Sequence, residues 1–304
     1  MSATATNKRK PTGLTFTNTE KIYWPKEGYT KGDLINYYNS IAPWILPHLK
    51  NRPLSLKRNP DGIEGPSFYH KDAGEHAPDF VTVFPVDSKS SNKVIDYIVC
   101  NNLNTLLYVA NLGCIEMNPW NSTMQHPDHP TWLVIDIDPS DNNTFEQVVE
   151  TALAVKEVCD KGGLPAFCKT SGASGMHVYI PLKQAYDYDQ VRDFAHIIAG
   201  LVHELVPDFT SLERSLAKRG KNNIYIDFLQ NRPGQTLSSV YSVRPVPGAT
   251  VSTPLEWKEV NRRLHPGQFT IRNISKRLDA KGDLFKGVLT GKANMAKALD
   301  AFGA

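Results

Sequence analysis

The alternation of apolar and polar residues divides the chain into predicted helices and strands. Apolar residues at helical spacing predict helices over 30–50, 94–111, 145–161 and 188–206. Short apolar runs between turn residues predict strands over 54–57, 80–86, 132–138, 166–170, 176–181, 224–229 and 239–244. Because these strands outnumber the helices that could cross between parallel neighbours, the pattern predicts an α+β fold with mixed or antiparallel sheets flanked by helices.

Composition indicates a globular protein and adds little about its partners. Hydrophobic residues make up 40% and charged residues 21% of the 304 residues, and the net charge of +3 supports a polyanionic partner only weakly. The polar start predicts a flexible tail over 1–13, followed by a single domain over 14–304. With no apolar run of roughly 18 residues, no secretory signal and four cysteines without short spacing, we expect a cytoplasmic protein without a membrane segment.

Two carboxylates end the most apolar of the predicted strands. Asp136 and Asp138 lie two residues apart, so their side chains are expected on the same face. Like charges at this spacing favour a divalent cation such as Mg²⁺ or Mn²⁺, which also clamps phosphates. An isolated Asp-x-Asp is more often a solvated strand end, so the pair alone does not establish a metal site.

A third carboxylate, Asp227, lies inside the predicted strand 224–229. Acids are rarely buried unless they are paired or bind a metal ion. Three acids carried on strands suit a two-metal phosphoryl-transfer site. A salt bridge between Asp227 and an arginine is the alternative.

The loop 171–175 joins two predicted strands and has the residues of an anion site. Its hydroxyls and glycines, Ser171 and Gly172 among them, can turn backbone N–H groups toward a phosphate. His177 begins the next strand and can donate to a phosphate oxygen, and Arg244 can do so through its planar guanidinium. A hairpin turn with a packed histidine is the alternative.

Two further segments suggest binding. Phe68 and Tyr69, close to Lys71, suit a stacked base beside its phosphate, although adjacent aromatics are more often divided between core and surface. His126 and His129 suggest zinc, but the segment lacks a fourth ligand and is predicted to be a loop.

Taken in order, these segments resemble the polymerase domain of bacterial ATP-dependent DNA ligase D, of the archaeo-eukaryotic primase superfamily. The resemblance covers nearly the whole chain, and the ordered set is specific although no single segment is. Besides the segments above, it rests on Thr17-Asn-Thr-Glu-Lys21, Tyr29-Thr-Lys31, Arg52-Pro-Leu-Ser-Leu-Lys-Arg58, Pro60-Asp-Gly62, Ile115-Glu-Met-Asn-Pro-Trp120 and Tyr241-Ser-Val-Arg244.

The resemblance implies a primase-like catalytic core and a role for each matching residue. Asp136, Asp138 and Asp227 match acids that bind two Mn²⁺ or Mg²⁺ ions, and Ser171 and His177, with Arg244 close by, match residues that hold a nucleoside triphosphate. The remaining matches are Lys21 and Lys31 for a DNA 5′-phosphate, Phe68 and Tyr69 for a template base, and Lys57 and Arg58 as further basic contacts.

The implied reaction is the addition of ribo- or deoxyribonucleotides at DNA ends and short gaps during bacterial non-homologous end joining. The implied partners are gapped or broken 5′-phosphorylated DNA, the end-binding protein Ku, and a ligase domain in the same chain or another. The implied setting is the bacterial cytoplasm at the nucleoid.

Four positions depart from the family pattern. Asn118 stands where a histidine near the nucleotide is usual, Ser174 replaces a common lysine, and Gln230 and Val246 replace arginines of some members. Since charged hydrogen bonds contribute roughly 1.5–3 kcal/mol each, these losses are expected to weaken phosphate affinity or to shift nucleotide preference.

Other functions fit the same residues. A two-metal nuclease or phosphohydrolase would use the same acids, and a catalytically weak module would bind 5′-phosphorylated ends without adding nucleotides. A primase would start strands without a primer.

Overall fold

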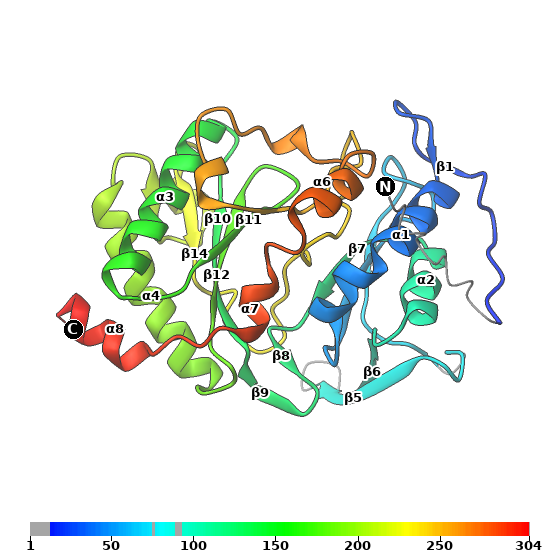
Figure 1. Cartoon of the computed structure of the whole chain (residues 1–304), viewed down its shortest axis with the longest axis horizontal. Helices are drawn as coiled ribbons and strands as arrows, with labels where there is room; N and C mark the ends of the chain where they lie inside the picture. The colour runs from blue at the N-terminus through cyan, green and yellow to red at the C-terminus, as the bar shows by residue number, and fades with distance from the viewer. Residues whose placement is uncertain (1–12, 75–76, 89–92, 304) are drawn as a thin grey trace, which may run out of the picture.

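The computed structural model describes residues 13–74, 77–88 and 93–303, which form two groups of elements (Figure 1). The first group contains β1 (Ile22–Trp24), β2 (Tyr29–Thr30), α1 (Lys31–Leu49), β3 (Leu54–Arg58), β4 (Phe68–His70), β5 (Thr82–Ser88), β6 (Lys93–Val99), α2 (Leu103–Asn111), β7 (Cys114–Pro119), β8 (Ser122–Thr123) and β9 (His126–Pro130). The second contains β10 (Trp132–Asp138), α3 (Phe145–Lys161), β11 (Phe167–Thr170), β12 (Met176–Pro181), α4 (Tyr188–Leu205), β13 (Thr210–Ser211), α5 (Leu216–Arg219), β14 (Ile224–Asp227), β15 (Pro254–Leu255), the 3₁₀ turns η1 (Trp257–Glu259) and η2 (Pro266–Gln268), α6 (Ile274–Lys281), α7 (Lys286–Thr290) and α8 (Met295–Phe302).

The second group is built on a six-stranded sheet with the order β13-β14-β10-β12-β11-β15. Only β13 and β14 run parallel among these neighbours, and the other pairs are antiparallel. Helices α3 and α4 lie side by side and contact β10 and β12 on one face of the sheet (Figure 1). This confirms the prediction of an α+β fold with mixed sheets flanked by helices.

The alternation of side chains on β10 separates the two faces of this sheet. Leu133, Ile135 and Ile137 pack in the hydrophobic cluster that includes α3 and α4, whereas Val134 packs in a second cluster with α1 and α2. Because residues two apart share a face, Asp136 leaves the sheet on the side away from α3 and α4.

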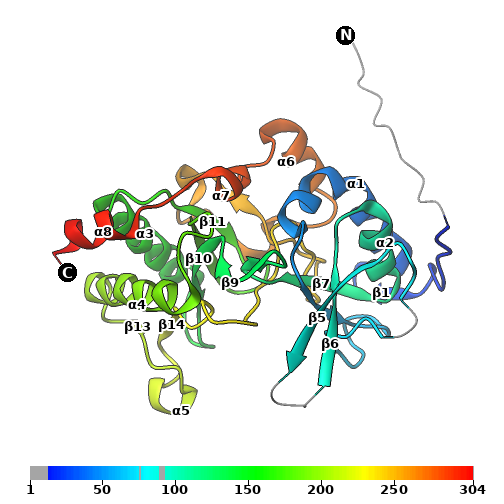
Figure 2. The ribbon, with the colours of Figure 1, turned by 90° about the horizontal axis from the view of Figure 1, so that it is seen from below.

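The first group surrounds helix α1, which begins with a capping box. The Thr30 hydroxyl accepts from the Asp33 N–H while the Asp33 carboxylate accepts from the Thr30 N–H, so two otherwise unpaired donors of the first turn are satisfied. The helix packs against α2, and the three-stranded sheet β4-β3-β7 lies beside them. Hairpin β5–β6 projects from this group on the side where α5 leaves the other one (Figure 2).

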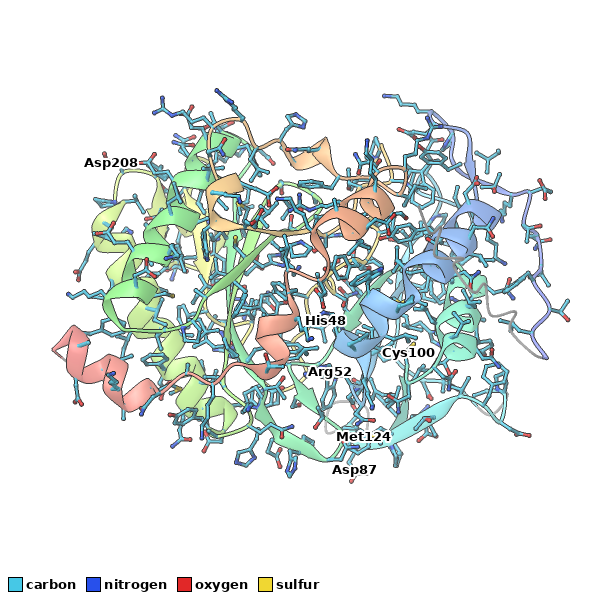
Figure 3. All side chains as sticks on the ribbon, in the orientation of Figure 1. His48, Arg52, Asp87, Cys100, Met124 and Asp208 are labelled. Atoms are coloured by element: carbon cyan, nitrogen blue, oxygen red, sulfur yellow. The ribbon has the colours of Figure 1, made fainter. Side chains whose placement is uncertain are left out.

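Arg52 joins the two groups (Figure 3). Its buried guanidinium lies 3.6 Å from the ring centroid of Trp132, donates to three carbonyls of residues 120–122, and donates to Thr131 Oγ1 at 2.7 Å. Since every acceptor is neutral, desolvation dominates and lowers the pKa of Arg52 to about 9.

Three sequence predictions were wrong. The range 94–111 is not one helix, because its first half forms strand β6, whose β-branched and aromatic residues pair with β5. The range 126–129, predicted as a loop, lies in strand β9. The range 239–244 is a turn with a single bridge between Val243 and Val251, because Tyr241 adopts a φ of 66° that interrupts an extended strand.

Residues 1–12 of the predicted tail over 1–13 lie outside the described residues. Within the described ranges, none of the helices has the length and apolar content needed to cross a membrane.

Candidate active site

One residue from each of four neighbouring strands forms a line across the side of the large sheet that faces away from α3 and α4. Lys169 of β11 is the register partner of His177 on β12, His177 is the partner of Asp136 on β10, and Asp136 is the partner of Asp227 on β14. Register partners on antiparallel strands have Cβ atoms roughly 4.5–5.5 Å apart, so these side chains are direct neighbours. We call Lys169, His177, Asp136 and Asp227 the transverse row.

Asp138 lies next to this row at the end of β10. Burial raises the pKa of the carboxyls of Asp136, Asp138 and Asp227. For Asp136 the shift is large, because the charges of Asp138 and Asp227 add to desolvation. The charge of Arg219 partly opposes the shift at Asp138, and hydrogen bonds from Leu229 N and Gln230 Nε2 partly oppose it at Asp227. Three crowded, partly dehydrated carboxylates are a donor set that favours a divalent cation.

The acids lie together without forming a closed ligand set. Within the described part of the chain, no three His, Cys, Asp or Glu side chains are arranged to hold an ion. Both oxygens of Asp227 already accept hydrogen bonds, from Leu229 N at 2.7 Å and from Gln230 Nε2 at 3.0 Å. The residues therefore fit oxygen coordination by their chemistry.

The loop 171–175 is held tightly against strand β10. The Ser171 hydroxyl accepts from the N–H groups of Ala173 and Gly175, and this geometry closes the turn. A Cβ on Gly175 would lie 2.2 Å from the Ile137 carbonyl oxygen, and Gly172 has a φ of 77°, which favours glycine. Both glycines are thus required by the backbone of the predicted anion loop.

Arg244 lies behind this loop and is already engaged by the protein. Its Nε donates to Glu116 at 2.9 Å, and its Nη1 donates to the Ser171 carbonyl at 2.6 Å. The contact with buried Glu116 orients the guanidinium, which lines the same pocket as Ser171 and His177.

A pocket of about 260 Å³ collects most of the predicted nucleotide and metal residues. Its walls include Asp136, Asp138, Ser171, His177, Arg244 and Asn118. Asp227 lines an adjoining smaller cavity with Arg214 and Arg232, and Gln230 borders both.

Three of the four positions that depart from the family pattern, Asn118, Ser174 and Gln230, border this pocket. Asn118 is buried, and its amide donates to the Ser55 carbonyl at 3.1 Å. Val246 is not among the residues that line the pocket, and its carbonyl accepts from Trp24 Nε1.

The predicted aromatic pair lies at the edge of the pocket on strand β4. Phe68 and Tyr69 are 47% and 60% exposed, so neither belongs to the core, and Tyr69 borders the pocket. Their register partners are the predicted basic residues: Arg58 lies 5.2 Å from the Phe68 ring centroid and Lys57 lies 6.0 Å from that of Tyr69. These cations support the rings from the neighbouring strand. Lys71 is exposed just after β4.

The two lysines predicted to bind a 5′-phosphate are neighbours, but only one is accessible. The Lys31 N–H donates to the Lys21 carbonyl at 2.8 Å, which brings their chains together. Lys31 is buried, and its Nζ donates to the Thr17 carbonyl at 2.7 Å. Lys21 is 39% exposed and forms an ion pair with Asp61.

Sequence reasoning missed two charged residues of the site. Glu116 is buried among apolar neighbours, and the rule that buried acids are paired could have marked it. Lys169 is fully buried, but its sequence gives no sign that strand register places it beside His177. Burial, the Lys169 charge and the Arg244 charge together hold the pKa of His177 well below its usual value.

Known proteins resemble this chain over most of its length. The sequence model of the family described as "LigD, primase-polymerase domain" matches residues 30–285. The bifunctional non-homologous end joining protein LigD of Bacillus subtilis is 34% identical over 270 residues, which are 88% of this chain and 43% of that protein. The multifunctional non-homologous end joining protein LigD of Pseudomonas aeruginosa is 29% identical over 88% of this chain and 31% of its own length. This chain therefore spans less than half the length of these relatives.

A solved structure shares the fold. The polymerase domain of Mycobacterium tuberculosis ligase D, determined in complex with DNA, superposes with a TM-score of 0.84 and 26% sequence identity. The superposition covers 92% of this chain and 99% of that one, so it includes both groups of elements.

Proposed function

The chain belongs to the LigD primase-polymerase domain family, and on this premise we propose that it adds nucleotides to the 3′ end of a DNA strand at a break or short gap. We propose further that residues 14–304 act as one catalytic unit in bacterial end joining. The observation that supports the proposal is the transverse row, which makes Asp136 the direct neighbour of both Asp227 and His177 and places Asp136 and His177 in one pocket with the predicted anion loop.

In the proposed reaction, the primer 3′-oxygen forms a bond with the α-phosphorus of a nucleoside triphosphate, and pyrophosphate leaves. Asp136, Asp138 and Asp227 would hold two Mn²⁺ or Mg²⁺ ions, which supply charge neutralisation at the α-phosphate and at the leaving pyrophosphate when bound. Burial raises the pKa of Asp227, so its carboxylate is a better acceptor for the 3′-hydroxyl proton than an exposed aspartate.

The chain's other residues would bind and orient the substrates. Ser171 and Gly172 would hold the triphosphate, while His177 would donate to a phosphate oxygen and Asn118 would contact the nucleotide from β7. Arg244 braces the loop through the Ser171 carbonyl and adds positive charge to the pocket. Ser171, His177, Asn118 and Arg244 line one pocket, which is the arrangement that this role requires.

The DNA would lie against the first group of elements. Phe68 and Tyr69 offer exposed rings for a template base, with Lys57, Arg58 and Lys71 close enough to the strand to attract phosphates. Lys21 would bind the 5′-phosphate across the gap by exchanging its Asp61 partner, and buried Lys31 would add its charge from behind. Ku and a ligase domain are the proposed protein partners, by analogy with the end-joining relatives.

Primer extension tests the proposal directly. The substrate is a duplex with a short gap and a 5′-phosphate, supplied with Mn²⁺ and either ATP or dATP, and the control is Asp136→Ala. We expect extension by the wild-type protein and none by the variant. Strand shortening would instead indicate a nuclease, and binding without extension would indicate an end-recognition module. Synthesis on an unprimed template would indicate a primase.

A further inference from the structure

Asn118 is a buried residue of the pocket whose amide orientation is fixed by the protein backbone. It lies on β7 opposite Ser55 of β3, and only 2% of it is exposed. Its Nδ2 donates to the Ser55 carbonyl at 3.1 Å. Because a carbonyl oxygen can only accept a hydrogen bond, the NH₂ group of Asn118 must face Ser55, and the amide oxygen points elsewhere.

The amide oxygen of Asn118 is left for a ligand. Within the residues that the structure describes, no donor reaches Oδ1, and Asn118 lines the pocket of about 260 Å³. An amide oxygen accepts hydrogen bonds and cannot donate them. A ligand can therefore pair with this oxygen only through an O–H or N–H group.

Ser238 adds a second unused polar group beside Asn118. An antiparallel bridge joins Trp120 of β7 to Thr236. Two residues away on each segment, the same register places Ser238 opposite Asn118, and side chains of such partners are direct neighbours. The Ser238 hydroxyl is buried and has no hydrogen-bond partner among the described residues, although Ser238 lines the pocket. Buried polar groups are normally paired, so this hydroxyl also lacks a partner that a ligand can supply.

One hydroxyl group on a ligand would satisfy both residues. It would donate its hydrogen to Asn118 Oδ1 and accept the hydrogen of the Ser238 hydroxyl. On a nucleoside triphosphate, ionised phosphate oxygens have no hydrogen to donate, and the base uses its hydrogen-bonding edge to pair with the template. The hydroxyls of the sugar are the donors that remain.

The position of Asn118 on its strand agrees with a sugar contact. Glu116 lies two residues earlier on the same face of β7, roughly 6.6 Å away along the strand. It binds Arg244, which in turn donates to the Ser171 carbonyl of the predicted anion loop. Asn118 is thus one step along the strand from the residues proposed to hold the phosphates, and the sugar is the part of the nucleotide that is joined to them.

We infer that Asn118 is a specificity-determining residue that, together with Ser238, binds a sugar hydroxyl of the incoming nucleotide. Asn118 accepts the hydroxyl hydrogen and Ser238 donates to the hydroxyl oxygen. The inference rests on the proposed function for the presence of a nucleotide in the pocket, whereas the orientation of the amide follows from its contact with Ser55. The sugar is accordingly selected by its capacity to donate a hydrogen bond rather than by its size.

Nucleotide affinity can be measured without nucleotide addition. A gapped 5′-phosphorylated duplex whose primer ends in a dideoxynucleotide cannot be extended, and it is mixed with Mn²⁺ and the wild-type protein. Competition against a fluorescent ATP derivative then gives Kd for ATP, for its 2′-deoxy and 3′-deoxy forms, and for the forms with fluorine at either position. We expect loss of the recognised hydroxyl to raise Kd roughly three- to tenfold, the range of one or two hydrogen bonds. Fluorine at that position should not restore the affinity, because it cannot donate.

Three variants test the residues assigned to this contact. In Asn118→Ala, ATP and the deoxy analogue should bind with equal affinity, and in Ser238→Ala the ratio of their Kd values should fall by at least half. Ser55→Ala is the matched control, because it keeps the backbone carbonyl that orients Asn118, and Ser55 is not among the residues that line the pocket. It should retain the wild-type ratio. Each variant is compared with itself across analogues, so a general loss of affinity does not imitate the result.

The results distinguish this inference from the proposed function. The wild-type ratio in Asn118→Ala or Ser238→Ala, full affinity for the fluoro analogues, or equal affinity of the wild-type protein for all analogues would overturn the inference. If such a protein extends an ordinary primer, the proposed function stands. The expected pattern of affinities without extension of an ordinary primer would instead contradict the proposed function and leave the sugar contact intact.

Discussion

At the scale of single residues, the site combines side chains that destabilise one another. Asp136 is nearly dehydrated and lies beside two more carboxylates, and its pKa is raised well above the usual value as a result. In the absence of a cation, this charge opposes folding. Functional sites commonly retain such unfavourable groups because the reaction needs them.

Replacement of Asp136 by asparagine should therefore separate stability from activity. In chelator, Asp136→Asn should increase the free energy of unfolding by about 1 kcal/mol, because a neutral amide of the same shape removes the repulsion. Urea denaturation measures the gain, and primer extension should be abolished in the same variant. A loss of stability in chelator would contradict this account of the site.

The ion pair between Lys21 and Asp61 competes with DNA in the proposed function. Asp61→Asn frees the Lys21 ammonium, so we expect affinity for a 5′-phosphorylated gap to rise roughly two- to fivefold, the range expected for an exposed ion pair. Fluorescence anisotropy measures the affinity. The control is Asp160→Asn, which removes a carboxylate from another surface ion pair, with Lys156. An equal rise for a 5′-hydroxyl gap would show a nonspecific charge effect instead.

At the scale of elements, two glycines and the Ser171 hydroxyl together shape the predicted anion loop 171–175. Gly175 lies so close to β10 that a methyl group would collide with the carbonyl of Ile137, the residue between Asp136 and Asp138. The loop and the acids therefore cannot move independently.

A single methyl group should accordingly impair catalysis. Gly175→Ala should lower kcat/KM for nucleotide addition by roughly 100-fold, since small displacements of positioning groups have effects of that size. The matched control is Gly200→Ala in helix α4, where a Cβ meets no atom within 4 Å. That substitution should stabilise the protein by about 0.5–1 kcal/mol. Wild-type kinetics in Gly175→Ala would show that the loop moves freely.

The segment from η1 to α6 is held by a cluster of charges that should respond to acid. Burial opposes ionisation of Glu259, but hydrogen bonds from Arg277 and Lys281 outweigh it and lower its pKa to about 2. A lowered pKa means that the stabilisation is complete above the unfolded-state pKa, near 4.5, and is lost as the pH falls toward 2.

The pH dependence of this stabilisation can be measured as the difference in the free energy of unfolding between the wild-type protein and a Glu259 variant. Glu259→Gln should lower the free energy of unfolding by about 1 kcal/mol at pH 7, the upper range for a partly exposed network. The deficit relative to wild type should shrink between pH 4.5 and pH 2. Urea denaturation at several pH values measures it, with Glu150→Gln on the exposed side of α3 as control. A deficit that stays constant to pH 3 would contradict the assigned pKa.

At the scale of the whole molecule, the pocket lies where two hydrophobic clusters meet. The transverse row belongs to the large sheet, whereas Asn118, Tyr69 and Glu116 come from the first group of elements. The site can therefore form only if contacts between the two groups of elements hold them in one orientation.

Arg52 contacts both groups of elements, so its substitution should strongly reduce the stability of the protein. Arg52→Met leaves several buried carbonyls without a donor, so we expect a decrease of roughly 3 kcal/mol in the free energy of unfolding. Arg52→Lys should restore little of the lost free energy of unfolding, because a compact ammonium cannot replace the planar guanidinium that lies over Trp132. Chemical denaturation followed by tryptophan fluorescence measures both, and a change below 1 kcal/mol would contradict the assigned role.

The sequence predicted the parts of this molecule whose signals are local. Strand β10, helix α3 and the turn 171–175 follow from apolar periodicity and turn residues, and the proximity of Asp136 and Asp227 follows from carboxylates within apolar runs. Strand β6 was misassigned because its apolar positions satisfy helical spacing until its partner β5 is known. The position of Lys169 beside His177 was not predictable, since it depends on register between strands.

The transverse row has a consequence for how this sequence can vary. Each of its four members comes from a different strand, so, apart from the loop 171–175 between Lys169 and His177, the connecting segments are free to change length. Within each strand, however, a shift of one residue would turn the side chains to the opposite face of the sheet, so the strand register cannot change. One residue inserted within β14 would turn Asp227 toward α4 and bring Ile226 into the pocket, whereas several residues added between β13 and β14 would leave the row intact. Insertions and deletions in this lineage should therefore accumulate outside the strands, however far apart the acids become in sequence.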